Sequence, residues 1–305
     1  MKKRVVVTGG TGFIGAALCA ELEAAGYDIV VLSRGEGAGV SGIRRVRWDA
    51  RGPQGWGHEV DGAFAIVNLA GDNIGSGRWT AGKKRAIRES RIDAGRAVTA
   101  AVSAARAKPK IVLQASAIGW YGDRGDEKLA EDSARGEGFL PSVAREWEDS
   151  TTEVEDFGMR RVIVRTGVVL GRGGMLKRAA LPFRLFAGGI PGGGRPWLSW
   201  IHLRDAVRAI RFVIERKDAS GVYNLTSPAP VRTAEFYRQL GRALHRPVWM
   251  PLPAFALKIA FGEMAHELML SGQRVLPERL LEAGFEFKFP GLEQALAEIF
   301  KDWGR

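Results

Sequence analysis

The sequence predicts an α/β protein, a doubly wound parallel sheet of the Rossmann type with a smaller, mainly helical region on the carboxyl-terminal, substrate side. Three observations support this fold class. An apolar strand near the start of the chain runs into a glycine cluster and then into a helix. Strand-like and helix-like segments alternate through the first half of the chain, as they do in a parallel sheet. After Gly171, glycines and prolines punctuate short elements instead.

The strand, glycine cluster and helix at residues 4–25 predict a dinucleotide site. Val5 to Val7 form the apolar strand, and residues 13–25 have the pattern of a helix. The glycines of the turn are Gly9, Gly10, Gly12 and Gly15. Glycines permit a tight turn and let the main chain approach a pyrophosphate, while the helix amino terminus offers unpaired N–H groups to the phosphates.

The second strand, residues 28–32, indicates which dinucleotide is bound. An NAD site usually has an acidic residue about 20 residues beyond the glycines, which bonds the ribose hydroxyls. Here the strand ends in Ser33 and Arg34, and a planar guanidinium beside a hydroxyl suits the 2′-phosphate of NADP. NADP(H) is therefore the predicted cofactor. The alternative is that Arg34 is an ordinary solvated arginine in a glycine-rich turn. The glycines of that turn are Gly35, Gly37 and Gly39.

The remaining elements extend the alternation. The predicted strands are 4–8, 28–32, 43–48, 64–69, 110–116 and 160–166, and helical periodicity marks 80–105 and 142–156. We expect residues 1–170 to form the nucleotide-binding domain, with a returning segment at about 200–228. Residues 171–305 are expected to form the smaller substrate-side region, with a helical tail at 247–305.

The composition indicates a globular protein with a basic balance. The 305 residues are 46% hydrophobic, and the formal net charge is +11. No apolar run has membrane-spanning length and no signal peptide precedes the first strand, so a cytoplasmic protein without a membrane partner is expected. The basic residues are scattered and lack zinc-finger spacing or an RNP-type signature. The charge therefore favours attraction of anionic cofactors and substrates, with nucleic-acid binding as the weaker interpretation.

The cysteine and histidine content predicts neither a disulfide nor a metal site. Cys19 is the single cysteine, lies on the predicted first helix and is expected to be buried. His58, His245 and His266 are far apart and have no ligand spacing.

Motifs spread over the whole chain resemble one superfamily. They are Thr8-Gly-Gly-Thr-Gly-Phe-Ile-Gly15, Asn68-Leu-Ala-Gly71 and Trp200-Ile-His-Leu-Arg-Asp205. This combination is similar to that of the extended short-chain dehydrogenases/reductases. Further motifs resemble the atypical subgroup labelled "epimerase family", whose C-terminal segment is similar to a domain of unknown function. These are Trp48-Asp49, Arg78-Trp79, Ser90-Arg91, Arg165-Thr-Gly-Val-Val-Leu-Gly171 and Gly272-Gln-Arg-Val-Leu-Pro277.

The resemblance implies a set of cofactor contacts. The implied residues are Gly9, Thr11, Gly12, Phe13, Ile14 and Gly15 at the pyrophosphate, Ser33 and Arg34 at the 2′-phosphate, Asp49 at the adenine edge, Leu69, Ala70 and Gly71 at the adenosine half, Arg91 toward the phosphates, and Val169 at the nicotinamide end. For Arg91, the alternative is an exposed helix residue paired with Glu89 or Asp93.

The resemblance does not extend to the usual catalytic pair. The superfamily uses a tyrosine as acid and base, with a lysine four residues later that lowers the tyrosine pKa. The corresponding stretch, residues 138–147, has no tyrosine, and Arg145 is its only cation. Hydroxyls remain nearby at Ser116 and Tyr121, although the usual serine position falls on Ala117. Ser116 and Tyr121 are therefore catalytic candidates, and the alternative for Tyr121 is a packed aromatic with a structural hydroxyl.

His202 is the third catalytic candidate, because an imidazole exchanges protons near neutral pH. The alternative is that it supports the fold by bonding the backbone. Arg195, Trp197 and Trp200 are expected either to form a wall for an anionic or ring-shaped substrate or to cover a core.

The favoured function is an NADP(H)-dependent oxidoreductase or epimerase-like enzyme for a small carbonyl, alcohol or nucleotide-sugar-like substrate. The alternative is an NADP(H)-binding sensor or scaffold without turnover. The missing tyrosine–lysine pair favours the alternative, whereas the separate substrate-side region opposes it.

Overall fold

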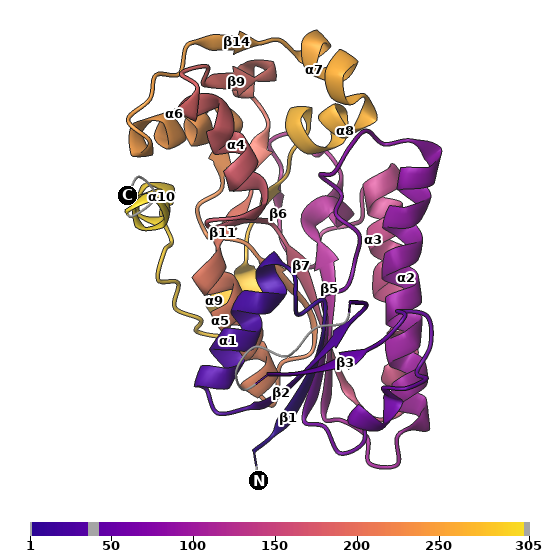
Figure 1. Cartoon of the computed structure of the whole chain (residues 1–305). Helices are drawn as coiled ribbons and strands as arrows, with labels where there is room; N and C mark the ends of the chain where they lie inside the picture. Colours follow the sequence, from indigo (N-terminus) through magenta and orange to yellow (C-terminus); the bar gives the residue numbers. More distant parts are fainter. Residues whose placement is uncertain (1, 36–42, 302–305) are drawn as a thin grey trace.

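The computed structural model describes residues 2–35 and 43–301 (Figure 1). Gly37 and Gly39, assigned by the sequence to the turn after Arg34, lie outside the described residues.

The strands of the main sheet are β1 (Arg4–Thr8), β2 (Asp28–Ser33), β3 (Ile43–Arg47), β4 (Ala65–Asn68), β5 (Ile111–Ala117), β7 (Arg160–Thr166) and β12 (Gly221–Leu225). Short two-stranded ladders join β6 (Lys128–Leu129) to β15 (Arg274–Val275), β8 (Val168–Leu170) to β11 (Trp200–His202), β9 (Gly189–Pro191) to β14 (Met250–Leu252), and β10 (Trp197–Leu198) to β13 (Val231–Arg232). The α-helices are α1 (Phe13–Ala24), α2 (Ala81–Ala104), α3 (Phe139–Asp149), α4 (Gly174–Arg184), α5 (Leu203–Glu215), α6 (Thr233–Ala243), α7 (Ala254–Phe261), α8 (Glu263–Ala265), α9 (Glu278–Glu282) and α10 (Leu292–Phe300).

The main sheet has seven parallel strands in the order β12-β7-β5-β4-β1-β2-β3. The chain therefore winds outward from β1 in both directions, which confirms the predicted doubly wound fold. At such a reversal point the loops after neighbouring strands diverge, and ligands bind in the crevice between them.

Helices cover both faces of the sheet, so the central strands are buried on both sides (Figure 1). Val5, Val6 and Val7 in β1 are all fully buried. Val5 and Val7 join the core under α1 and α5, while Val6 joins the core under α2. Because these strands are buried on both faces, their sequences are continuous apolar runs and do not alternate between apolar and polar residues. Cys19 is buried in α1, as the sequence predicts.

Of the strands in the main sheet, β12 is the one that the sequence did not predict. It lies within the returning segment and pairs in parallel with β7. Asn224 interrupts its apolar pattern, and in the fold this amide is fully buried. The side chain accepts a hydrogen bond from the Tyr121 hydroxyl (2.8 Å) and donates to the Leu276 carbonyl (2.9 Å).

The predicted helix at 142–156 was wrong at both ends. α3 begins at Phe139, because Pro141 fits the first helical turn, where its missing N–H is not needed. It ends at Asp149, and residues 152–154 form a separate 3₁₀ turn.

The second half of the chain builds a smaller region beyond the carboxyl ends of the sheet strands (Figure 1). α4, α6 and α10 enclose a separate core around Phe183, Phe236 and Leu296. The tail then returns to the sheet region, because β15 pairs with β6 and α9 contacts β12. Among the described residues, no helix is both long and apolar enough to cross a bilayer.

Candidate functional site

Polar side chains at three neighbouring strand ends fix the loops after β1 and β4. The Thr8 hydroxyl donates to Asn68 Oδ1 (2.6 Å). It accepts from the backbone amides of Leu69 and Ala70 (both 3.1 Å). Asn68 Nδ2 donates in turn to Gln114 Oε1 (2.9 Å) on β5. Because buried polar groups are costly without partners, this connected set holds the two loops in one relative position.

Glycines in the turn after β1 let backbone segments pack so closely that no side chain fits between them. Gly9 has a φ of +67°, and a Cβ on it would lie 2.8 Å from the Leu69 carbonyl oxygen. A Cβ on Gly15 would lie 2.2 Å from the Gly9 carbonyl oxygen, so α1 packs too closely on the turn for any residue with a side chain at position 15. Gly12 is the N-cap of α1, and no side chain caps the helix there. The result is a main-chain cradle with N–H groups of the kind that bind phosphate.

A groove of about 480 Å³ opens beside this cradle. Residues after β1, β2 and β4 meet in it, although they are far apart in sequence. The predicted cofactor residues that line it are Gly9, Thr11, Gly12, Ser33, Arg34, Asp49, Leu69, Ala70 and Gly71. The α2 side of the groove is formed by Ala86, Glu89, Ser90 and Asp93.

Four other predicted cofactor residues lie behind the groove. A Cβ on Gly173 would lie 2.8 Å from the Phe13 ring, so this ring packs flat on a glycine segment. Ile14 packs against the main core, and Val169 is buried in β8 as part of that core. Gly15 lies against the backbone of Gly9 and Gly10. Side-chain contact of these residues with a cofactor stays a prediction.

The groove end near β2 carries both signs of charge. Arg34 is exposed there and lines the groove, as does Arg51. Asp49 lines it too, and its carboxylate accepts from the backbone amides of Arg51 (2.8 Å) and Gly52 (3.3 Å). These backbone bonds lower the pKa of Asp49. Arg34 and Arg51 carry two positive charges against the one negative charge of Asp49 at this end, which favours an anionic ligand.

Arg91, on α2, lines a second cavity next to the groove. Its Nη1 donates to the Ile87 carbonyl (2.8 Å), and its guanidinium lies over the Trp147 ring at 4.9 Å from the centroid. Burial lowers the pKa of Arg91 to about 10, so the side chain stays charged at neutral pH. These contacts differ from the exposed ion pair with Glu89 or Asp93 that the sequence left open.

The second cavity lies at the carboxyl ends of β5 and β7 and has a volume of about 190 Å³. Its lining is mainly apolar. Distant parts of the chain supply it: Ile74, one face of α3, residues 117–119, residues 166–168, residues 197–199 and residues 267–273.

The face of α3 toward this cavity carries Leu140 and Ala144. These two residues are one helical turn apart, the spacing of the tyrosine and lysine in the superfamily. Neither side chain can transfer a proton. Arg145, the only cation of the stretch, pairs with Asp149 on the exposed side of the helix (3.4 Å).

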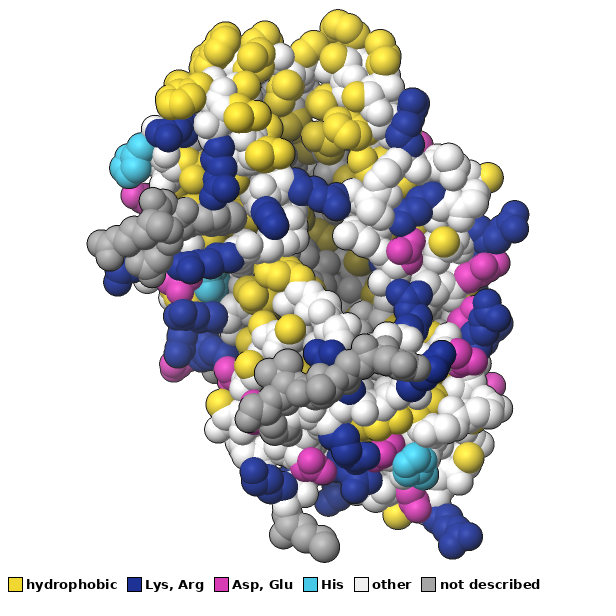
Figure 2. Space-filling model, in the orientation of Figure 1, with side chains coloured by type: hydrophobic (Ala, Val, Ile, Leu, Met, Phe, Trp, Pro, Cys, Tyr) yellow, Lys and Arg dark blue, Asp and Glu magenta, His cyan; other side chains and the backbone are white. Residues whose placement is uncertain are grey.

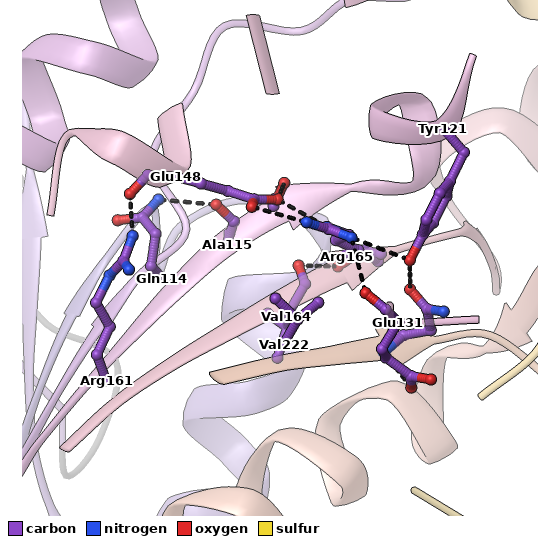
Figure 3. Close-up of polar contacts among 12 residues, drawn as sticks. Gln114, Ala115, Tyr121, Glu131, Glu148, Arg161, Val164, Arg165 and Val222 are labelled. Carbon is purple, nitrogen blue, oxygen red and sulfur yellow. Dashed lines mark hydrogen bonds and ion pairs between the residues drawn. The ribbon is translucent and has the colours of Figure 1, made fainter. Parts of the chain in front are cut away.

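Ser116 and Tyr121 belong to a buried polar network, in which Arg165 lies between Glu148 and Tyr121 (Figure 3). Ser116 Oγ donates to Glu148 Oε1 (2.6 Å). Arg165 donates to the same carboxylate through Nε (2.9 Å) and Nη2 (3.0 Å). The Tyr121 hydroxyl accepts from Arg165 Nη1 (3.2 Å) and donates to Asn224. Burial raises the pKa of Tyr121, which makes it a weaker acid.

Strand alternation separates Ser116 from the second cavity. Neighbouring side chains of a strand point to opposite faces, and Ala117 is the one that lines the cavity. Ser116 is only 3% exposed. The structure thus places neither Ser116 nor Tyr121 in the lining of the groove or the second cavity. Their catalytic roles stay predictions.

His202 caps a helix. Its Nδ1 accepts from the backbone amide of Arg204 at the start of α5 (3.1 Å), and its Nε2 lies 3.0 Å from Glu298 Oε2. Burial lowers the pKa of the imidazole and so favours its neutral form. These contacts match the fold-supporting alternative, and His202 lines neither the groove nor the second cavity.

Of the expected substrate wall, Trp197 lines the second cavity. The Arg274 guanidinium lies over its ring, 4.4 Å from the centroid. Trp200 instead is fully buried and donates its indole N–H to the Ala229 carbonyl (3.0 Å), so it covers a core. Arg195 lines neither the groove nor the second cavity.

Glu267 lines the second cavity and was not predicted from the sequence. It lies on a π-helical turn, His266–Leu270, a conformation that occurs frequently at functional sites. Its side chain is 25% exposed, and burial raises its pKa. Among the described residues, Arg91 and Glu267 are the charged side chains of this lining. No motif marks Glu267, because packing of the tail alone brings it to the second cavity.

Within residues 2–35 and 43–301, no three His, Cys, Asp or Glu side chains lie close enough together to form a metal site.

Comparisons with known proteins match this arrangement. The family model "NAD dependent epimerase/dehydratase family" matches residues 5–226, and "Domain of unknown function (DUF1731)" matches residues 252–299. Epimerase family protein YfhF of Bacillus subtilis is 40% identical over 302 residues, covering 98% of this chain and 98% of that protein. Epimerase family protein SDR39U1 of Bos taurus is 36% identical, covering 97% of this chain and 99% of that protein.

Two solved structures bear on the site and the fold. The crystal structure of human epimerase family protein SDR39U1 (isoform 2) with NADPH has a TM-score of 0.90 and 35% identity, covering 98% of this chain and 99% of that chain. UDP-glucose 4-epimerase of Thermotoga maritima with UDP-glucose has a TM-score of 0.81 at 14% identity, covering 99% of this chain and 98% of that chain, a likeness of fold alone.

Proposed function

Because the chain belongs to the NAD-dependent epimerase/dehydratase family, we propose that it binds NADPH along the groove and reduces a small carbonyl compound in the second cavity. The observation that carries this proposal is the contact between the two spaces. Gly71 lines the groove, and a Cβ on it would lie 3.1 Å from Cζ of Arg91, which lines the second cavity. A cofactor in the groove and a substrate in the second cavity would therefore lie on either side of Gly71 and Arg91.

The residues present fit a phosphorylated dinucleotide. The cradle keeps its shape because Gly9 packs against the Leu69 carbonyl and Gly15 against the Gly9 carbonyl, and its main-chain N–H groups would face a pyrophosphate. Arg34 and Ser33 would hold the 2′-phosphate, since a guanidinium forms charge-assisted hydrogen bonds to phosphate oxygens. The human relative crystallised with NADPH supports this choice of cofactor. When bound, the nicotinamide supplies or accepts hydride.

The second cavity favours a small substrate. Its volume of about 190 Å³ is below the roughly 300–1,000 Å³ common for drug-sized ligands. Its mainly apolar lining offers few partners to a pyrophosphate or a sugar. A compact carbonyl or alcohol compound with an apolar body therefore fits better than a nucleotide sugar.

Glu267 would supply the proton. A bound cofactor would supply hydride to the carbonyl carbon, and the Glu267 carboxylic acid would give its proton to the carbonyl oxygen. The products would be an alcohol, the oxidised cofactor and the Glu267 carboxylate, which water would reprotonate. Arg91 lines the same cavity, and its guanidinium would donate a hydrogen bond to the substrate oxygen and orient it.

The test is turnover with purified protein. NADPH is mixed with a panel of small aldehydes and ketones, NADP+ is mixed separately with UDP-glucose, whose alcohol groups can only give hydride, and cofactor absorbance is followed. We expect oxidation of NADPH by members of the small carbonyl panel and no reduction of NADP+ by the nucleotide sugar. Reduction of NADP+ by the nucleotide sugar, with no oxidation of NADPH by the carbonyl panel, would contradict the assigned substrate class.

One observation favours a second function, an NADPH-binding sensor or scaffold. The face of α3 toward the second cavity is apolar at Leu140 and Ala144, where the superfamily keeps its proton-transfer pair. Tight NADPH binding without oxidation by any compound in the panel would establish this second function in place of the first.

A further inference from the structure

An apolar surface is exposed on the smaller region, over α4, the loop before β14, and α7. We call it the apical patch. Its members are Leu181, Leu185, Phe186, Trp249, Phe255, Ile259 and Phe261. Leu185 and Ile259 are 71% and 72% exposed. Figure 2 shows hydrophobic side chains gathered over this end of the molecule. Monomeric proteins seldom leave so many large apolar groups together in water.

The exposure of apolar side chains is clearest on α7. Its sequence, Ala-Phe-Ala-Leu-Lys-Ile-Ala-Phe, is apolar almost all round, as in helices buried on every side. In the fold, however, Leu257 is its only buried residue. Phe255 and Ile259, one turn apart, point away from the protein and are strongly exposed. The outer face of α7 is therefore apolar, and no residue within 2–35 or 43–301 covers it.

The charge around the apical patch has one sign. Residues 173–204 and 236–262, which supply the patch, contain no Asp or Glu. Exposed basic residues within them are Lys177, Arg178, Arg184, Arg195, Arg204, Arg238, Arg242 and Lys258. Arg246 lies over the Phe186 ring, 4.4 Å from its centroid, so a cation sits directly on the patch. Glu263, the first acid after α7, is paired with Lys84 (2.8 Å).

We propose that the apical patch docks on the surface of a membrane that contains anionic lipids. The expectation of no membrane partner concerned membrane-spanning segments, which such docking does not need. Apolar and aromatic side chains enter the boundary between headgroups and acyl chains, and the surrounding cations attract the negative headgroups. The eight residues of α7 span only about 12 Å, so the helix lies in the interface and does not cross the bilayer. Trp249, 63% exposed, is an aromatic of the type that favours this interface.

A second copy of the chain fits this surface less well. A two-fold interface places the same surface on both partners, so the acid-free basic rims would face each other. Like charges brought together in this way oppose association. An anionic lipid surface instead offers both an apolar interior and the opposite charge.

The test is co-sedimentation of the full-length protein with phosphatidylcholine vesicles, with and without phosphatidylglycerol. We expect binding to the anionic vesicles, weakening as salt is raised, and a blue shift of tryptophan fluorescence. The double variant Phe255→Ser/Ile259→Ser should bind at least about tenfold more weakly, since burying each such side chain is favourable. Leu281→Ser is the matched control, because Leu281 is 47% exposed but lies on α9, outside the patch. It should bind like the wild type.

Lys258→Glu tests the charge without altering apolar packing, and should weaken binding to anionic vesicles while NADPH affinity stays unchanged. Three outcomes would overturn the proposal. The wild type fails to bind anionic vesicles, or both patch variants bind as it does. Alternatively, the protein forms a dimer that the double variant breaks, which would make the patch a self-interface.

Discussion

Glu267 is the residue whose titration tests the proposed chemistry. Its pKa is raised by burial, and reduction of a carbonyl needs the protonated acid. The reduction rate should therefore fall as pH rises through that raised pKa, and oxidation of the alcohol should show the opposite trend. Glu267→Gln should lower kcat by about 10²–10⁴-fold and remove this pH dependence, while NADPH affinity is unchanged. Steady-state rates across pH provide the measurement.

Glu263→Gln is the matched control for Glu267→Gln. Glu263 lies four residues earlier and is paired with Lys84 outside the second cavity. It should leave the pH profile intact. An unchanged profile in Glu267→Gln would remove Glu267 from the proton-transfer step.

Arg34 should determine the preference for NADPH over NADH. The two cofactors differ by the 2′-phosphate, and charge-assisted hydrogen bonds of this kind contribute about 1.5–3 kcal/mol. Arg34→Ala should weaken NADPH binding roughly 10–100-fold and leave NADH binding nearly unchanged. Dissociation constants for both cofactors measure this. If the variant keeps the wild-type preference, Arg34 is only the solvated arginine that the sequence left as an alternative.

At the scale of elements, α5 depends on a histidine cap. His202→Ala should destabilise the protein by about 0.5–2 kcal/mol, whereas His202→Asn, which keeps a capping acceptor, should cost less. Burial lowers the His202 pKa below its unfolded value. The neutral ring therefore stabilises the fold above the unfolded pKa of about 6.5, and this contribution is lost as pH falls through the lower folded value.

Urea unfolding of wild type and both variants across pH measures the role of His202. Only the wild type should lose stability through the titration of this ring. If His202→Ala is as stable as wild type but loses turnover, the catalytic interpretation of His202 stands instead.

Elements with local signals were predictable from the sequence. β1 and α1 were predictable, because an apolar strand, a glycine turn and a helix follow one another directly in the sequence. β12 was not, since burial of Asn224 depends on Tyr121 and Leu276, which are distant in sequence. The predicted helix at 142–156 was misplaced at both ends, because α3 already contains Pro141 in its first turn and residues 152–154 form a separate 3₁₀ turn.

At the scale of the whole molecule, the sequence predicted the family and the doubly wound sheet, and both are confirmed. The residues of the groove follow strand ends, whose position is set by the topology of a parallel sheet, so motifs locate them well. The second cavity is different. It forms only when the tail at 267–273 packs against α3 and the end of β7. No local pattern encodes that packing, and Glu267 therefore has no signature in the sequence.

The proposed reduction depends on NADPH occupying the main-chain cradle. Calorimetric titration with NADPH tests this most directly, using wild type, Gly15→Ala and the control Gly291→Ala. A Cβ on Gly15 would lie 2.2 Å from the Gly9 carbonyl oxygen, whereas one on Gly291 would meet nothing within 4 Å. We predict that wild type and Gly291→Ala bind NADPH equally and that Gly15→Ala binds at least about tenfold more weakly. Absence of NADPH binding by wild type, or unchanged binding by Gly15→Ala, would contradict the account.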